Sequence, residues 1–195
     1  MRKVTVPEIP AMARTLASAF ADDPIMSLLF NGPVPVPRTT RFFETMGRVQ
    51  LHHGHTYITG GDEAAAIWAP PGKWKLPVKD IVTSTPAFLR VFRGRLPASL
   101  KILSVLEKNH PSEPHYYLEF IGTDPTHQGK GFGSELMRPM IERCDTEGVG
   151  AYLESSKESN LAFYGRFGFE TTKVIHHKNP AGDPVPQWLM WRNPR

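Results

Sequence analysis

A glycine-rich hexapeptide, Gln128-Gly129-Lys130-Gly131-Phe132-Gly133, is the feature that most constrains what this chain can fold into. Residues 116–121, just before it, are rich in aromatic and β-branched types, which predicts a strand, and residues 123–126 have turn chemistry. After it, apolar residues recur at helical spacing, at Leu136, Met137, Met140, Ile141 and Cys144. The three glycines therefore occupy a turn between a strand and a helix.

Such a turn suits a pyrophosphate. Glycine lets the backbone N–H groups approach an anion closely, and a helix start adds roughly half a positive charge. Other phosphate motifs fit poorly, because Ser134 stands where a dinucleotide fingerprint needs its third glycine, and no Gly-Lys-Ser/Thr run forms a P-loop. Taken alone, the turn is equally compatible with a tight strand-to-helix connection that binds nothing.

A second stretch, residues 159–169, adds a linked signal. Asn160 lies four residues before Tyr164, a spacing that places both on one face of a helix, and Gly168 is a helix stop. Together with the turn, this stretch resembles the GCN5-related N-acetyltransferase (GNAT) superfamily. The Gln/Arg-x-x-Gly-x-Gly/Ala cofactor signature of that superfamily appears here as Gln128, Gly131 and Gly133.

The resemblance covers residues 116–169 well and is thin elsewhere. Within the superfamily, the chain is most similar to puromycin N-acetyltransferase-like members, through residues 66–71, 124–131 and 153–156. It implies acetyl-CoA (coenzyme A) as the cofactor, with the acetyl group passing directly to an amine. The cofactor-binding residues that it implies are Ile121, Gly122, Thr123, Gln128, Gly129, Lys130, Gly131, Phe132, Gly133, Ser134, Asn160 and Tyr164.

Three side chains are candidates for proton transfer. A phenol has a pKa near 10 and stays protonated at neutral pH, so Tyr164 is the candidate acid, the role that the resemblance also assigns to it; an ordinary core tyrosine is the alternative. Glu119 is the candidate base, because burial of a carboxylate in an apolar strand is costly and raises its pKa. A salt-bridged structural carboxylate or a water chain remains the alternative, and Glu154 is a second candidate base.

The bulk composition describes an ordinary globular chain. Its 195 residues suit one domain, with a net charge of +4. No apolar run is long enough to span a bilayer and the start lacks a signal-peptide core, so we expect a cytoplasmic protein with no membrane partner. No nucleic-acid motif accompanies the basic charge, which an anionic cofactor would partly explain. Cys144, the single cysteine, is expected to pack in the core, and a homodimer is left open.

The order of predicted elements gives an α/β fold. We expect a single GNAT-like domain with a mixed central β-sheet, helices on both faces and a helical insertion between strands 3 and 4. Strands are predicted at residues 2–6, 56–59, 64–69, 116–123, 151–154, 170–177 and 187–192, the fourth and fifth being parallel. Helices are predicted at residues 8–20, 25–30, 38–53, 131–147 and 160–167.

The insertion, residues 69–114, contains eight basic and three acidic residues. Its apolar residues have helical spacing and predict two or three packed helices: Ile81, Phe88, Leu89, Phe92, Leu96, Leu100, Leu103 and Leu106. We weigh equally a helical cover over the acceptor side and a solvated basic face over extra core.

Three histidines, His52, His53 and His55, raise the possibility of a metal site. They lie in a connection without obvious convergent support, so no metal is expected.

The acceptor expected from the long insertion and from the resemblance is the primary amine of a small molecule. An acetyltransferase acting on protein amines and an acyl-CoA-binding regulatory domain without catalysis are the alternatives.

Overall fold

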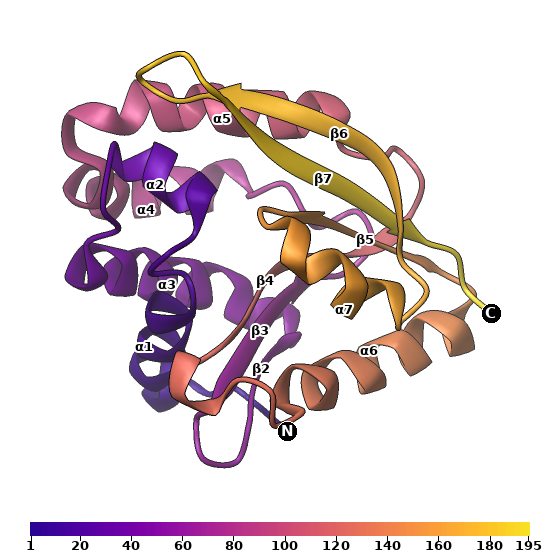
Figure 1. The fold of residues 1–195 in the computed structure, drawn as a ribbon. Coiled ribbons are helices and arrows are strands. Elements are labelled where there is room, and N and C mark those ends of the chain that lie inside the picture. The colour runs from indigo at the N-terminus through magenta and orange to yellow at the C-terminus, as the bar shows by residue number, and fades with distance from the viewer.

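The computed structural model describes residues 1–195 as an α/β domain around a seven-stranded sheet of order β1-β2-β3-β4-β5-β7-β6 (Figure 1). The strands are β1 (Arg2–Lys3), β2 (Thr56–Ile58), β3 (Ala64–Ala69), β4 (His115–Thr123), β5 (Gly150–Ser155), β6 (Glu170–Lys178) and β7 (Pro184–Arg192). All neighbouring strands are antiparallel except β4 and β5, which the crossover helix α6 (Phe132–Glu147) makes parallel, as predicted.

Helices cover both faces of the sheet. On one face α1 (Ile9–Ala19), α2 (Pro24–Phe30) and α3 (Val36–Gln50) pack over β2, β3 and β4, and on the other α6 and α7 (Leu161–Gly165) pack over β3, β4 and β5 (Figure 1). Strand β3 is buried along its whole length and its side chains alternate between the two cores, with Ala65 and Ile67 in one and Ala66 and Trp68 in the other. Strand β3 therefore contributes side chains to the cores on both faces of the sheet.

Strand β4 is irregular around Glu119, the candidate base. Its pairing with β3 shifts register, because Ile67 lies opposite Phe120 while Trp68 lies opposite Leu118, which leaves Glu119 in a bulge. Its parallel pairing with β5 also ends at Leu118 and Leu153, so the two strands separate beyond that point. The β5-facing backbone of residues 119–123 is consequently free of sheet partners.

The insertion consists of α4 (Val78–Phe92) and α5 (Leu96–Asn109), as predicted, and it completes the core around α2 and α3. Phe92 is 6% exposed, and its ring centroid lies 5.9 Å from that of Phe30 and 5.8 Å from that of Phe42. The prediction that all the regularly spaced apolar residues of the insertion pack in its core is wrong in part. Four residues predicted to pack are about half exposed, because both helices lie on the surface and bury only narrow stripes: Ile81, Leu89, Leu100 and Leu103.

Smaller differences from the predicted elements occur at the termini of segments. The first strand is shorter than predicted, because Pro7 opens a 3-10 turn at Val6–Glu8. The helix predicted from residue 160 is a 3-10 turn, Glu158–Asn160, followed by the short α7. None of the helices is long and apolar enough to cross a bilayer.

Candidate functional site

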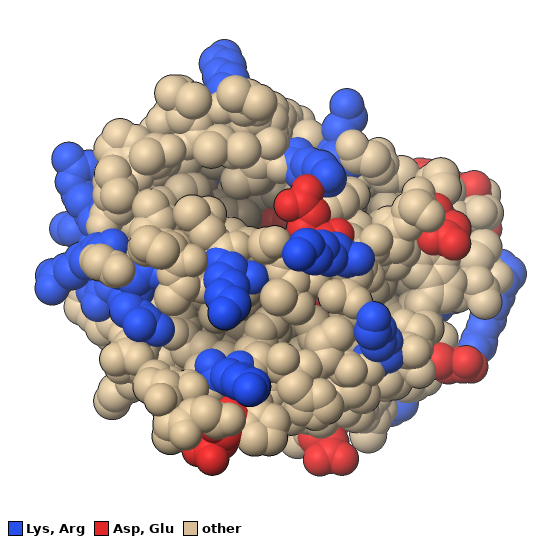
Figure 2. All heavy atoms as spheres, turned by 90° about the horizontal axis from the view of Figure 1, so that it is seen from above, with Lys and Arg blue, Asp and Glu red and all other residues tan.

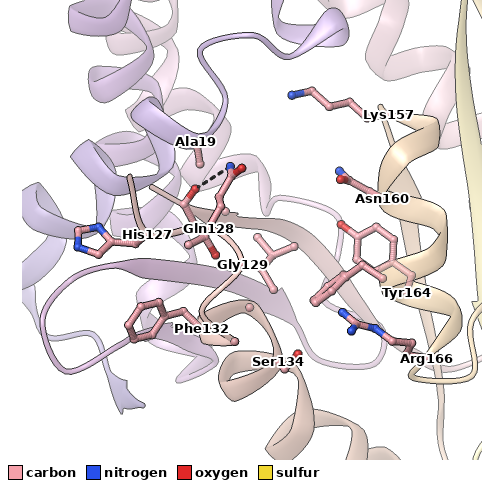
Figure 3. Close-up of a pocket in the computed structure, with 16 residues that line it drawn as sticks. Ala19, His127, Gln128, Gly129, Phe132, Ser134, Lys157, Asn160, Tyr164 and Arg166 are labelled. Atoms are coloured by element: carbon pink, nitrogen blue, oxygen red, sulfur yellow. Dashed lines mark hydrogen bonds between the residues drawn. The ribbon is translucent and has the colours of Figure 1, made fainter. Parts of the chain in front are cut away.

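A cavity of about 440 Å³ opens where the end of β4, the start of α6 and helix α7 meet. It gathers eleven of the sequence-predicted site residues: Ile121, Gly122, Thr123, Gln128, Gly129, Gly131, Phe132, Gly133, Ser134, Asn160 and Tyr164. Two segments about 30 residues apart in sequence thus face each other, with the turn on one side and α7 on the other (Figure 3). Lys130 and Glu119 do not line this cavity.

The turn has the backbone conformation that glycine permits. Gly129 and Gly131 have φ angles of 76° and 89°, in the region that side chains disfavour, and a Cβ added to either would meet no atom within 4 Å. Gly131 is the N-cap of the 16-residue α6 and offers no side chain to its first N–H groups. The start of α6 therefore presents unpaired donors and the positive end of its dipole to open space.

Polar side chains of the turn fall into two groups. Gln128 lines the cavity and its Nε2 donates to the carbonyl oxygen of Thr123 at 3.3 Å, which ties the turn to the end of β4 (Figure 3). Lys130 is exposed and its Nζ donates to the carbonyl oxygen of Thr126 at 3.3 Å, outside the cavity lining. Its position adds positive charge near the turn without direct contact.

On the opposite wall, Asn160 and Tyr164 point into the cavity (Figure 3). Asn160 occupies the N-cap position of α7, but its side chain makes no capping hydrogen bond, so simple capping does not explain it. Tyr164 is 7% exposed, and burial together with the nearby charge of Asp23 raises the pKa of its phenol. The phenol therefore remains a proton donor well above neutral pH.

Asp23 is a functional-site neighbour that the sequence did not single out. It is 4% exposed and caps α2, accepting from the backbone N–H of Met26 at 2.8 Å, while Ser156 donates its hydroxyl to the other oxygen. Burial raises the pKa of the Asp23 carboxyl. Because Ser156 follows β5, this acid links the α2 layer to the end of the parallel strand pair.

Five more residues of the cavity lining were missed at the sequence level: Ala19, His127, Lys157, Phe163 and Arg166. Two are cationic. Lys157 pairs with Asp22 at 2.5 Å, whereas the Arg166 guanidinium lies 5.4 Å from the Phe163 ring centroid and makes no ion pair. Lys157 and Arg166 lie within a few residues of Asn160 and Tyr164 in sequence, which could have marked them as cavity residues. The sequence alone did not show that their side chains face the cavity.

Glu119 lies in the β4 bulge, partly buried, with its side chain on the α3 face. One carboxylate oxygen accepts from Gln50 Nε2 of α3 and the other, Oε2, is buried with no hydrogen-bond partner. Burial, and then the charge of Glu154, raise the pKa of Glu119 to about 8. The salt bridge that would make it a structural carboxylate is absent.

Glu154, the second candidate base, lies on β5 one position past the last pair of the β4–β5 ladder. Its Oε2 accepts from the Tyr117 hydroxyl at 2.6 Å, and its side chain is 5% exposed. Burial raises the pKa of Glu154 to about 7. The two acids thus occupy neighbouring positions on the two strands that separate at this point.

Of the remaining candidates, Cys144 and His55 are buried, whereas His52 is exposed. Cys144 is buried in the α6 core, where burial raises the pKa of its thiol to about 12, so it is not a thiolate at neutral pH. His52 and His53 place their ring centroids 3.9 Å apart, while His55 bonds the Tyr57 hydroxyl at 3.1 Å on the other side of the connection. No group of three or more potential ligand side chains converges to hold a metal ion.

Comparisons with known proteins agree with this geometry. The model of the acetyltransferase (GNAT) family matches residues 98–169. An uncharacterised N-acetyltransferase of Schizosaccharomyces pombe is 27% identical, over 99% of this chain and 83% of its own length.

Among solved structures, a Corynebacterium glutamicum protein described as histone acetyltransferase HPA2 and related acetyltransferase is 23% identical. It aligns with a TM-score of 0.65 over 100% of this chain and 95% of that one. Polyamine N-acetyltransferase of Drosophila melanogaster is 16% identical, with a TM-score of 0.62 over 98% of both chains. The chain thus has the fold of these solved acetyltransferase structures, and residues 98–169 match the acetyltransferase (GNAT) family model.

Proposed function

We propose that this protein transfers an acetyl group from acetyl-CoA to the primary amine of a small molecule, by direct transfer without a covalent enzyme intermediate. One observation carries the proposal: the glycine turn at the start of α6 and the Asn160–Tyr164 face of α7 line the same cavity, beside the opening between β4 and β5. Phosphate-binding geometry and a buried proton donor thus meet at one place.

The cavity fits the cofactor. The open space beside Gly129 and Gly131 and the unpaired N–H groups of α6 suit a pyrophosphate, and Arg166 and Lys157 add positive charge. The free backbone of residues 121–123 suits the amide groups of a pantetheine arm, which Asn160 meets from the other side. Acetyl-CoA, when bound, supplies an activated thioester and a thiol leaving group.

The chain also offers a proton donor, a base and a group to polarise the carbonyl, which the transfer requires. Tyr164 stays protonated and donates to the leaving sulfur, since its raised pKa keeps the phenol neutral. Glu119 removes a proton from the acceptor ammonium, either directly or through a water, and its raised pKa brings it into the range of a useful base. A backbone N–H of residues 121–123, which line the cavity, would polarise the carbonyl of a bound thioester.

The acceptor is proposed to be small because several elements crowd the side of the sheet where Glu119 lies. Helices α1 and α3 and the insertion pack there, and the surface seen from above is hollowed near its centre, with acidic atoms at the hollow and Lys and Arg side chains around it (Figure 2). The motif likeness to puromycin-acetylating enzymes supports the same reading. So does the polyamine N-acetyltransferase, described as forming N-acetylagmatine.

The test is a specificity panel. Release of free thiol from acetyl-CoA is measured with arylalkylamines, diamines, agmatine and aminonucleosides, and with histone-like and N-terminal peptides. We expect a small amine to have a kcat/KM at least about tenfold above any peptide, about 1.4 kcal/mol of transition-state preference. A peptide that wins by that margin would establish a protein acceptor, and binding of coenzyme A without turnover of any amine would favour a regulatory domain.

A further inference from the structure

A second cavity, of about 640 Å³, lies between α3 and α4, the first helix of the insertion. We call it the α3–α4 groove. It shares no lining residue with the cofactor cavity and includes neither Glu119 nor Tyr164, so the transfer chemistry described above does not use it. Its volume lies within the range of about 300–1,000 Å³ that is usual for small-molecule sites. The groove is therefore large enough to hold a ligand of its own.

The start of α3 lies beside the end of α4 at one end of the groove. Arg38, in the first turn of α3, donates from Nε to the carbonyl oxygen of Val91, which is 2.7 Å away and near the end of α4. Arg41 lies one turn after Arg38, and Arg90 directly precedes Val91. Both line the groove, so two arginine side chains enter this end from opposite walls.

Four arginines at this end have no acidic partner: Arg38, Arg41, Arg90 and Arg93. Residues 24–43 and 81–106, which contain all four, include no Asp or Glu. Burial, and then the charge of Arg93, lower the pKa of Arg38, so these like charges lie close together. Figure 2 shows Lys and Arg side chains gathered on the side of the molecule where α3 begins and α4 ends, with no acidic side chain among them. An anion bound here would relieve a repulsion that the protein itself leaves uncompensated.

Arg93 holds its place against a backbone preference. Its φ of 51° and ψ of −133° form a combination that glycine adopts readily and that residues with a side chain rarely adopt. Strain of this kind is concentrated at binding and catalytic sites, where the surrounding structure maintains it. An arginine here, directly before Gly94, places one more positive charge beside Arg38.

The middle and the far end of the groove carry polar groups of a different kind. Ser84 is 7% exposed and lines the groove, and its hydroxyl has no hydrogen-bond partner in the protein. The hydroxyls of Thr45 and Thr83, in contrast, donate to carbonyl oxygens of their own helices. Glu44 and Asp80 also line the groove, and neither forms an ion pair. Their carboxylates accept hydrogen bonds from hydroxyl or amino groups but repel a second anionic group.

This pattern favours a compact anion attached to a neutral polar body. A phosphate group has three or four oxygens that accept hydrogen bonds, so guanidinium groups from two walls can bind it at once, whereas a carboxylate offers only two oxygens. Further along the groove, Arg48 and His52 are interspersed with Glu44 and Asp80, so no continuous basic track exists for the backbone of a nucleic acid. A body with several hydroxyl groups matches Ser84 and the two carboxylates.

We propose that the α3–α4 groove binds a small phosphate ester, with its phosphate between Arg41 and Arg90 and its hydroxyl-bearing body along Ser84 toward Asp80. Arg93 adds positive charge at the same end without lining the groove. Arg90 and Arg93, two of the basic residues of the insertion, thereby acquire a role. This second site takes no part in acetyl transfer, so its occupancy can be measured whether or not the protein acetylates amines.

Arginine side-chain NMR of the unmodified protein tests the site directly. The probes are ribose 5-phosphate and glucose 6-phosphate, with ribose, glucose and inorganic phosphate as controls. We expect both esters, at roughly millimolar concentration, to shift the Nε–Hε signals of Arg41 and Arg90, each assigned through its Gln variant. The signal of Arg138, on α6 across the sheet, should stay in place, and the free sugars should shift none of the three. If no arginine shifts, or if Arg138 shifts as much as the other two, the site is rejected. Inorganic phosphate that binds as tightly as the esters would overturn the assignment of an ester.

Charge variants separate the groove from the net charge of the protein. Binding of ribose 5-phosphate is followed through the backbone amide signal of Ser84, which every variant retains. Arg41→Gln/Arg90→Gln should weaken binding at least about tenfold, about 1.4 kcal/mol. Arg138→Gln/Lys178→Gln removes the same charge from two exposed residues outside both cavities, so it should change the affinity by less than about twofold. Equal weakening in the two double variants would overturn the proposal. So would a single-stranded oligonucleotide of about 20 nucleotides that displaces the ester at equal phosphate concentration, because the groove would then bind an extended polyanion.

Discussion

The glycine-rich turn of residues 128–133 and the insertion of residues 69–114 contribute to the protein in opposite ways, one through backbone groups and the other through side chains. The turn works through backbone: Gly129 and Gly131 hold positive φ angles, no side chain fills the space beside them, and the donors are N–H groups at the start of α6. The insertion works through side chains, with Phe92 filling a core and His110 reaching a buried acid.

This contrast explains why the role of the glycine-rich turn could be predicted from the sequence and the roles of individual side chains of the insertion could not. A backbone cradle depends on a few adjacent residues, so its geometry is encoded locally. The role of an inserted side chain depends on what a distant strand presents to it, and that appears only after folding. Four substitutions or conditions probe the contrast, from the largest expected effect to the smallest.

Gly131→Val should abolish coenzyme A binding. The side chain would occupy the open space beside α6, and a β-branched residue at a φ of 89° strains the turn. The measurement is the rise in melting temperature on adding coenzyme A, which we expect to disappear. Gly148→Val is a matched control, because Gly148 is the C-cap of the same helix, has a φ of 64° and also faces open space. If both variants respond to coenzyme A like the unmodified protein, the turn is only a connection.

Tyr164→Phe should lower kcat by roughly 10²- to 10⁴-fold with little change in coenzyme A affinity, as expected when a general acid is lost and the ring is kept. The measurement is steady-state turnover beside cofactor titration. Tyr57→Phe removes another buried tyrosine hydroxyl, one that bonds His55, and should leave kcat nearly unchanged. A Tyr164→Phe enzyme within about twofold of normal would place the proton donor elsewhere.

Phe92→Ala should destabilise the fold by about 3–5 kcal/mol, because it empties a site packed between Phe30 and Phe42. Leu103→Ala, in the same insertion but 55% exposed, should cost no more than about 0.5 kcal/mol. Urea unfolding of both variants measures the difference. Equal, small losses would mean that the insertion is a detachable cover with no share in the core.

The order of elements and the parallel β4–β5 pair followed from the sequence because hydrophobic periods are local signals, and the motif resemblance pointed to eleven of the sixteen residues that line the cavity. The face of the sheet on which the Glu119 side chain lies could not be predicted from the sequence, because a one-residue bulge opposite Ile67 and Trp68 determines it. Leu100 and Leu103 were predicted to pack on the same periodicity that correctly placed Phe92, because period alone cannot tell which helix has a partner. Asp23 escaped notice because its burial depends on α2 meeting the residues after β5.

The smallest effect concerns pH, and it arises where the insertion and β4–β5 bury Glu119 and Glu154. Their pKa values are raised from 4.5 to about 8 and about 7, so the folded protein holds protons that the unfolded chain has released. Stability from these two groups is therefore highest below about pH 4.5 and falls as the pH rises to about 8. Buried histidines with lowered pKa values, such as His110 and His115, act in the opposite direction below about pH 6.5 and mask part of the trend.

A difference measurement removes that masking. In the double variant Glu119→Gln/Glu154→Gln the histidines remain, so the free energy of unfolding of the double variant minus that of the unmodified protein isolates the acids. We expect this difference to grow with pH by about 2–4 kcal/mol between pH 5 and pH 8, less than the full linkage value because the site relaxes. The measurement is urea unfolding at several pH values. A difference that stays constant with pH would mean that both carboxyls ionise freely in the folded protein, and that the insertion does not seal them from water.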